Sequence, residues 1–254
     1  MRIVRHLPLL LALAALLAAA LLLPSLAHAQ SVSIDLGHAG APGATSRLVQ
    51  LTALVTALSL APSLLVMLTA FTRIIIVLSL LRSALGLQST PPNLVLIGLA
   101  LFLTYYVMAP VLDQAWAGGL LPMSQGRVGD LAGLEAAAEP FRHFMATNAR
   151  PADLRLFVDL AHLPVPDAPE ATPWRALIPA FMVGELRRAF EMGFLLYLPF
   201  IVIDLVVASV LMSLGMMMLP PNAVALPFKL IFFVLVDGWR LVAGSLVQSF
   251  VPHA

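Results

Sequence analysis

The chain has 254 residues, of which 61% are hydrophobic and only 11% are charged, and its mean hydropathy is +0.98. This composition excludes an ordinary soluble globular domain and indicates an integral membrane protein. The 14 basic and 13 acidic residues leave a formal net charge of +1, so charge gives no reason to expect a nucleic-acid partner. Because the sequence has no cysteine, it excludes disulfides and thiolate metal ligands.

The first 29 residues are predicted to be a cleavable signal peptide. A basic start and an apolar run over residues 7–23 precede the small-x-small motif Ala27-His28-Ala29. We expect cleavage between Ala29 and Gln30, and an uncleaved membrane anchor is the alternative. Residues 30–47 are rich in Gly, Ala and Ser and are expected to form an extracytoplasmic linker.

Residues 48–112 are predicted to form a first helical hairpin. Its two apolar runs, 48–85 and 93–112, are each long enough to cross a hydrocarbon core of about 30 Å, which needs about 20 helical residues. Gly86 can end the first helix, and the pair Pro91-Pro92 can begin the second.

Residues 113–178 are predicted to be a small helical segment outside the membrane, because they hold most of the acidic side chains. Amphipathic patterns predict short helices over about 128–149 and 152–162. So short a segment supports only a thin core. Phe144 and Phe157 therefore either pack within the segment or contact another subunit.

Residues 179–254 are predicted to form a second hairpin. One helix should run without a break from Pro179 through residue 214, and a last apolar segment covers 223–251. We name residues 214–220 between them the Met turn.

The Met turn holds three consecutive methionines, Met216, Met217 and Met218, between Gly215 and Pro220. Gly and Pro place them on a connection between helices and not along one helical face. Thioether side chains are unbranched and adapt to different neighbours. We interpret the turn as a deformable seal, with core filling or contact with lipid as the alternative.

Charged residues beside the second apolar helix have helical spacing. Glu185 and Arg188 lie three residues apart, and Arg187 and Glu191 lie four apart, so each pair can form on one helix face. They form either a solvated collar or a network of ion pairs between subunits.

Four further charges are predicted to be buried within apolar segments. Arg73 is expected to be buried in protein or to line water, or else to extend its guanidinium to the membrane surface. Asp237 can pair with Arg240 three residues later. Asp204 has no basic residue within a helical turn, so either it is protonated or its partner lies elsewhere in the chain. Lys229, across the Met turn, is its predicted partner.

Three stretches resemble the FliP family of flagellar type III export gate proteins, called SctR in injectisomes. They are residues 69–93, Pro179 to Phe194, and Pro227-Phe-Lys-Leu-Ile-Phe-Phe-Val-Leu-Val-Asp-Gly-Trp239. The resemblance extends from about Leu48 to Phe250, and Gly184 departs from it where the family usually has Ser or Thr. The signal peptide and the segment outside the membrane favour the flagellar branch over an injectisome homologue.

The resemblance implies an all-α protein of the bacterial inner membrane that belongs to the flagellar basal body. Several copies, five in relatives, would assemble with FliQ, FliR and other export apparatus membrane proteins into a helical ring that conducts unfolded flagellar subunits. The Met turn would then be a gasket around the closed pore. Phe144, Phe157 and Glu185 would lie at contacts between copies.

The distribution of charge gives a separate reason to expect such an assembly. If the signal peptide is cleaved on the extracytoplasmic side, four spans place the Gly86 turn and the Met turn on the cytoplasmic side of the membrane. Arginines between residues 127 and 188 then lie outside, against the positive-inside tendency. The helices are therefore expected to pack on one another more than on lipid, with Arg73, Asp204 and Lys229 buried in protein.

The sequence shows no nucleotide-binding loop, metal-ligand cluster or nucleophile constellation, so we predict a gated conduit and not an enzyme, with no cofactor. One alternative is a proton-coupled small-molecule transporter that uses Arg73, Asp204 and Lys229 as a relay. Another is a scaffold that nucleates the assembly without lining the path of the substrate.

Overall fold

A computed structural model describes residues 52, 55, 56, 59, 60, 62–64, 66–216 and 218–250. The chain divides into two units, Met1–Leu58 and Ser59–Ala254. In the first unit, the described residues Thr52, Val55 and Thr56 are helical. The predicted signal peptide, its cleavage point at Ala29 and Gln30, and the linker over residues 30–47 lie outside the described residues and stay predictions.

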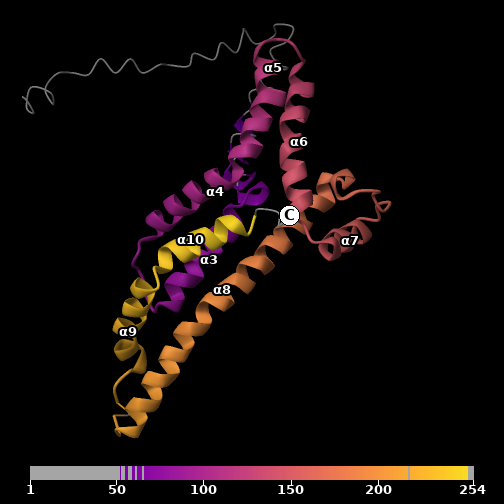
Figure 1. Cartoon of the computed structure of the whole chain (residues 1–254). Helices are drawn as coiled ribbons and strands as arrows, with labels where there is room; N and C mark the ends of the chain where they lie inside the picture. The colour runs from indigo at the N-terminus through magenta and orange to yellow at the C-terminus, as the bar shows by residue number, and fades with distance from the viewer. Residues whose placement is uncertain are drawn as a thin grey trace, which may run out of the picture. The chain divides into compact units, whose positions relative to one another are not determined.

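The described part of the second unit is helical and contains no strand, which confirms the predicted all-α fold. Figure 1 shows its elements, which in chain order are α3 (Phe71–Ala84), α4 (Asn93–Ala115), the π-helix η2 (Trp116–Leu120), α5 (Leu121–Ser124), α6 (Asp130–Asn148), α7 (Pro151–Leu160), the 3₁₀-helix η3 (Pro169–Ala171), α8 (Trp174–Ser213), α9 (Pro221–Leu235) and α10 (Gly238–Gln248).

The first hairpin turns where the sequence predicts. Gly86 has a φ of +77°, a conformation that glycine adopts without steric strain, and α4 begins directly after Pro92. The guanidinium of Arg82 donates a hydrogen bond of 2.6 Å to Oδ1 of Asn93, which joins the end of α3 to the start of α4.

The apolar run before this turn is not one straight helix. The helical segment Pro62–Leu68 meets Phe71–Ala84 at an angle of 84°. The Thr72 hydroxyl donates a hydrogen bond of 2.7 Å to the carbonyl of Val66, which gives a carbonyl next to the break a partner. The side-chain hydroxyl thus stabilises a bend that the apolar pattern does not indicate.

The second helix of the hairpin continues past residue 112, where the sequence predicted its end. Helical backbone runs from Asn93 through η2 and α5 to Ser124. Asp113 is exposed, so its charge gives the helix no reason to end. This extension packs antiparallel to α6, and the predicted short helices match α6 and α7 closely.

Helix α8 is the long element against which the others pack. It runs without a break from Trp174 to Ser213, as predicted for the second hairpin, although it contains Pro179 and Pro199. Helices α3, α6, α7 and α9 all contact it, and α3 makes the longest contact. Small residues on α8, including Ala180, Ala189 and Gly193, are buried, which allows close approach of the neighbouring helices.

The last apolar segment, predicted over residues 223–251, is not one continuous helix, because it breaks into α9 and α10. The two helices meet at 63°, and Asp237 between them has a φ of +51°. A Cβ on Gly238 would lie 2.1 Å from Cε2 of Phe233. The glycine therefore lets the Phe233 ring pack into the bend, where it also contacts Trp239 with ring centroids 5.4 Å apart.

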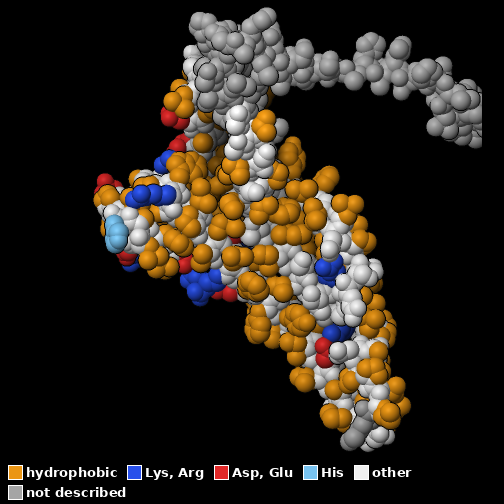
Figure 2. Space-filling view, turned by 180° about the vertical axis from the view of Figure 1, so that it is seen from behind, with side chains coloured by type: hydrophobic (Ala, Val, Ile, Leu, Met, Phe, Trp, Pro, Cys, Tyr) orange, Lys and Arg blue, Asp and Glu red, His pale blue; other side chains and the backbone are white. Residues whose placement is uncertain are grey.

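Among the described residues, two helical stretches, Asn93–Ser124 and Trp174–Ser213, are long and apolar enough to cross a membrane, and there are up to four such spans if each bent pair counts as one. Figure 2 shows hydrophobic side chains over much of the visible surface. These features agree with an integral membrane protein whose apolar faces meet lipid or other helices.

The close contact between η2 and α6 gives a prediction about two adjacent glycines. A Cβ on Gly119 would lie 2.4 Å from the backbone nitrogen of Ala137, whereas a Cβ on Gly118 would meet no atom within 4 Å. We expect Gly119→Ala to lower the free energy of unfolding by about 1–3 kcal/mol. Gly118→Ala should leave it unchanged or slightly higher. Denaturant unfolding in detergent measures both, and equal effects would contradict the predicted close packing.

Candidate functional site

The structure confirms that the described methionines of the Met turn lie on a connection between helices. Gly215 adopts a φ of +73°, and the N–H of Met216 donates to the carbonyl of Leu211 at 3.0 Å, which is a Schellman-type end to α8. Met216 is 44% exposed and Met218 is fully exposed, whereas Met217 lies outside the described residues. Within this chain, the two described methionines are therefore not core filler.

The Met turn lies at the end of a projecting hairpin. Figure 1 shows the end of α8 and the start of α9 extending past the turn that joins α3 to α4. A groove of about 450 Å³ runs between these two helices, and no charged side chain lines it. Its lining is formed by Val202, Ile203, Val206, Val207, Val210, Leu211, Val224 and Phe228.

Arg73 is buried in protein, which excludes the alternative that it extends to the membrane surface. Its side chain is 1% exposed and forms a two-point ion pair with Glu185, in which Nε donates to Oε2 at 2.8 Å and Nη2 donates to Oε1. Nη1 donates to the carbonyl and the hydroxyl of Ser249, at 3.0 and 2.8 Å. The guanidinium also lies 3.7 Å from the centroid of the Phe250 ring.

Aromatic rings extend this buried site from Phe250 into α6 and α8. The rings of Phe250 and Phe144 stack with centroids 6.0 Å apart, and Phe144 meets Phe181 edge-on at 5.8 Å. The cluster therefore joins α3, α6, α8 and the residues after α10. We name Arg73, Glu185, Ser249, Phe250 and Phe144 the Arg73 cluster.

Two predicted subunit contacts need correction, because Glu185 and Phe144 are core residues of this chain. Glu185 is fully buried and Phe144 is 9% exposed. Arg188 does lie 3.7 Å from Oε1 of Glu185, yet the principal partner of that carboxylate is Arg73. Sequence spacing on α8 favoured Arg188 because it could not include a partner on another helix.

The remaining predicted subunit contacts stay predictions. Phe157 is half-buried and packs against the core. Arg187 and Glu191 form the expected pair on α8, with Nε donating to Oε1 at 2.7 Å, and both side chains are exposed. Arg188 is half-buried.

The predicted ion pair between Asp204 and Lys229 is present. Nζ of Lys229 lies 2.6 Å from Oδ2 of Asp204, and the lysine is 6% exposed. The same ammonium donates to the carbonyl of Ala84 at the end of α3, at 3.1 Å. Oδ1 of Asp204 is buried and has no hydrogen-bond partner in the described part of the chain.

Asp237 was predicted to be buried, and that prediction is wrong. Its side chain is 65% exposed, and Oδ2 lies 3.9 Å from Nη1 of Arg240, so the predicted local pair does form. The break between α9 and α10 turns both side chains outward, which a continuous helix would not have done.

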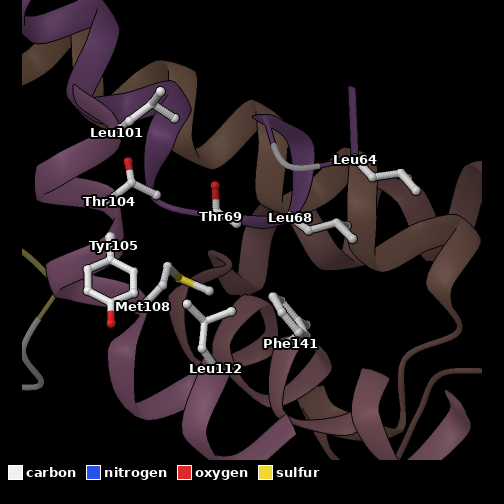
Figure 3. Close-up of a pocket in the computed structure, with 9 residues that line it drawn as sticks. All are labelled: Leu64, Leu68, Thr69, Leu101, Thr104, Tyr105, Met108, Leu112 and Phe141. Carbon is white, nitrogen blue, oxygen red and sulfur yellow. The ribbon is translucent and has the colours of Figure 1, made fainter. Parts of the chain in front are cut away.

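A second apolar groove, of about 410 Å³, lies between the segment Pro62–Leu68, α4 and α6. Figure 3 shows side chains of all three converging on it, among them Leu68, Met108 and Phe141. No charged side chain lines this groove. The described residues likewise contain no group of three or more His, Asp or Glu side chains that could hold a metal ion.

Sequence reasoning missed the pairing of Arg73 with Glu185 and the role of Ser249 and Phe250. The available signal was that Arg73 lies in a predicted apolar helix, that Glu185 lies just before another, and that the two carry opposite charges, so each could satisfy the other. Their separation of 112 residues made other pairings equally consistent. A backbone carbonyl such as that of Ser249 carries no sequence signal at all.

Removing Arg73 should be far more destabilising than removing an exposed arginine. Arg73→Met leaves the Glu185 carboxylate buried without its cation, which costs about 3–5 kcal/mol, and the double variant Arg73→Met/Glu185→Met should recover most of that loss. Arg187→Met, which removes an exposed pair with Glu191, should leave the unfolding midpoint almost unchanged. Unfolding midpoints in detergent report all three. Equal losses for the two single variants would contradict the buried pair.

Comparison with known proteins agrees with this arrangement. A sequence profile of the FliP family matches residues 54–246. Three similar proteins, each named "Flagellar biosynthetic protein FliP", come from Caulobacter vibrioides, Agrobacterium fabrum and Bacillus subtilis. The first is 56% identical over 230 residues, covering 90% of this chain and 86% of the relative. The second is 48% identical over 237 residues, covering 92% of this chain and 97% of the relative. The third is 46% identical over 217 residues, covering 85% of this chain and 98% of the relative. The chain belongs to the FliP family of flagellar biosynthetic proteins.

Proposed function

We propose that the chain is a pore subunit of the flagellar export gate, and that its Met turn closes a conduit for unfolded flagellar subunits. Membership of the FliP family supplies the role in flagellar export, as a structural component and not as an enzyme. The observation that carries the finer proposal is the exposure of Met216 and Met218 at the end of the projecting hairpin.

The chemistry of methionine suits a seal of this kind. Its side chain has three rotatable bonds and a polarizable sulfur, so it can pack against itself in an empty pore and against diverse residues in a passing chain. Several copies of the turn would exclude ions and water when no substrate is present. Because such contacts are apolar and adaptable, they would yield to an extended chain without selecting its sequence.

The exposed apolar faces of the chain support assembly with other subunits in the bacterial inner membrane. On α4, a narrow stripe of residues four apart is buried, namely Leu96, Ala100, Thr104 and Met108. Phe102 on the opposite face is 78% exposed. We propose that further copies of this chain, FliQ, FliR and lipid cover these faces, since bare apolar helices do not remain exposed to water.

The arrangement of charges counts against the proton-coupled transporter. Arg73 and the Ala84 carbonyl lie eleven residues apart on α3, which is about 16 Å along the helix. Arg73 donates hydrogen bonds to Glu185 and Ser249, whereas Lys229 donates hydrogen bonds to Asp204 and Ala84. A relay through Arg73, Asp204 and Lys229 would need partners to bridge these two separate sites.

The seal predicts a leak when its thioethers are removed. Replacing Met216, Met217 and Met218 together with Ala should leave assembly intact and raise ion conductance through the complex several-fold, because the closed turn no longer fills the pore. Met212→Ala is the matched control, since Met212 is exposed but lies within α8 before the turn. Single-channel or vesicle conductance measures the effect. Unchanged conductance in the triple variant would refute the seal.

A crosslinking experiment separates a conduit from a scaffold. A photo-crosslinking residue at Met218 should capture a substrate that is stalled during export, because the turn lines its path. The same residue at Leu131, which is 73% exposed at the start of α6, is the control and should capture little. Capture at neither position, with export otherwise active, would favour the scaffold.

A further inference from the structure

Three helices meet at the ammonium group of Lys229. The lysine belongs to α9, its ion-pair partner Asp204 belongs to α8, and its carbonyl partner Ala84 is the last residue of α3. The C-terminal end of a helix favours a positive charge, since its last carbonyls lack partners within the helix. One side chain therefore satisfies a charge on the second hairpin and a free carbonyl on the first.

This contact lies at the base of the projecting hairpin. Lys229 is eight residues after Pro221, or about 12 Å along α9, and Asp204 is nine residues before Ser213, or about 14 Å along α8. Among the hydrogen bonds of the described residues, the one that joins α9 to α3 is the bond from Lys229 to Ala84. The Met turn thus lies at the free end of a hairpin that is bound to α3 through Lys229.

Each helix of this hairpin also has a weakened backbone near the contact. Pro199 interrupts the hydrogen bonding of α8 five residues before Asp204, and Pro227 interrupts that of α9 two residues before Lys229. The Phe200 ring lies 6.0 Å from the Phe232 ring, so α8 and α9 pack directly on each other beside Pro199. A proline within a helix is a usual position for a kink.

We propose that Lys229 is a positioning residue that fixes the closed position of the Met turn, and that the hairpin swings about Pro199 and Pro227 when its bond to Ala84 is released. A rotation of about 10° at this level moves the turn by about 2 Å. Oδ1 of Asp204 is buried without a partner, so the contact leaves one acceptor unsatisfied. The bond to Ala84 is a single hydrogen bond to a neutral carbonyl, so it is easier to release than the two-point charged pair of Arg73 and Glu185. The functional consequence rests on the proposed gate, whereas the positioning itself does not.

Distance measurements between spin labels test the positioning directly. The sequence has no cysteine, so Gln88→Cys in the first turn and Leu214→Cys beside the Met turn introduce unique labels, and both positions are exposed. With labelled full-length chain diluted into unlabelled chain in the assembled complex, the parent should give one narrow distance distribution. Lys229→Met should broaden it or shift it by about 2 Å or more. Lys229→Arg keeps a cation that can donate to both Asp204 and Ala84, so it should preserve the distribution.

Arg240→Met is the matched control, because the partner of Arg240 among the described residues is Asp237, and that pair is exposed. It should leave the distance distribution unchanged. A distribution for Lys229→Met that matches the parent would overturn the proposal.

A charge exchange distinguishes a three-helix contact from a simple ion pair, and it serves if Lys229→Met does not fold. Asp204→Lys combined with Lys229→Asp restores an ion pair between α8 and α9, so the unfolding midpoint should largely recover. A carboxylate at position 229 cannot donate to the Ala84 carbonyl, so the distance distribution should stay broad. A narrow distribution in the exchanged variant would overturn the role of Ala84.

Ion conductance separates this proposal from the proposed gate. A broadened distribution together with raised conductance in Lys229→Met supports both. A broadened distribution with parental conductance supports the positioning by Lys229 and counts against a seal at the Met turn. An unchanged distribution rejects the positioning, whatever the conductance.

Discussion

The paired burial of Arg73 and Glu185 is the constraint on which the packing of the second unit depends. An arginine in an apolar helix is tolerated only where its charge is neutralised and its donors are satisfied. Glu185 and Ser249 meet that demand, and they lie on α8 and after α10. The pair therefore fixes how α3 lies along α8, and the same site holds Ser249 and Phe250, which follow α10, beside Phe144 of α6.

The two buried ion pairs differ in how completely their atoms are satisfied, and this suggests different roles. At Arg73, the two carboxylate oxygens of Glu185 both accept hydrogen bonds, and a ring packs on the guanidinium. At Lys229, one oxygen of Asp204 is left without a partner, and prolines weaken both helices nearby. The first site is suited to hold the fold, and we propose that the second allows the hairpin to move.

The site that holds the fold and the site that is proposed to allow movement lie at different positions along α8 and α3. Helices α3, α6, α7 and α9 all contact α8, but the hairpin extends past the turn that joins α3 to α4, so α9 is the neighbour of α8 near the Met turn. A segment with fewer packed neighbours opens or bends at lower free energy than a covered one. A gate at the Met turn could therefore change its shape without loosening the rest of the chain.

The sequence by itself determined the features that local chemistry specifies. Gly and Pro placed the turns at Gly86 and at Met216, and the lengths of the apolar runs indicated membrane helices. The pair of Asp204 and Lys229 also followed, because Arg240 accounted for Asp237 and left one cation. The family resemblance, carried by long stretches of residues, was confirmed by comparison.

Only the tertiary structure decided which distant residues meet and where apparently continuous helices break. Arg73 and Glu185 lie 112 residues apart, and Asp237 turns outward because Gly238 admits the Phe233 ring. Neither fact is contained in propensity or spacing along one helix. Both depend on how side chains from separate helices fill the same space, which local sequence patterns do not encode.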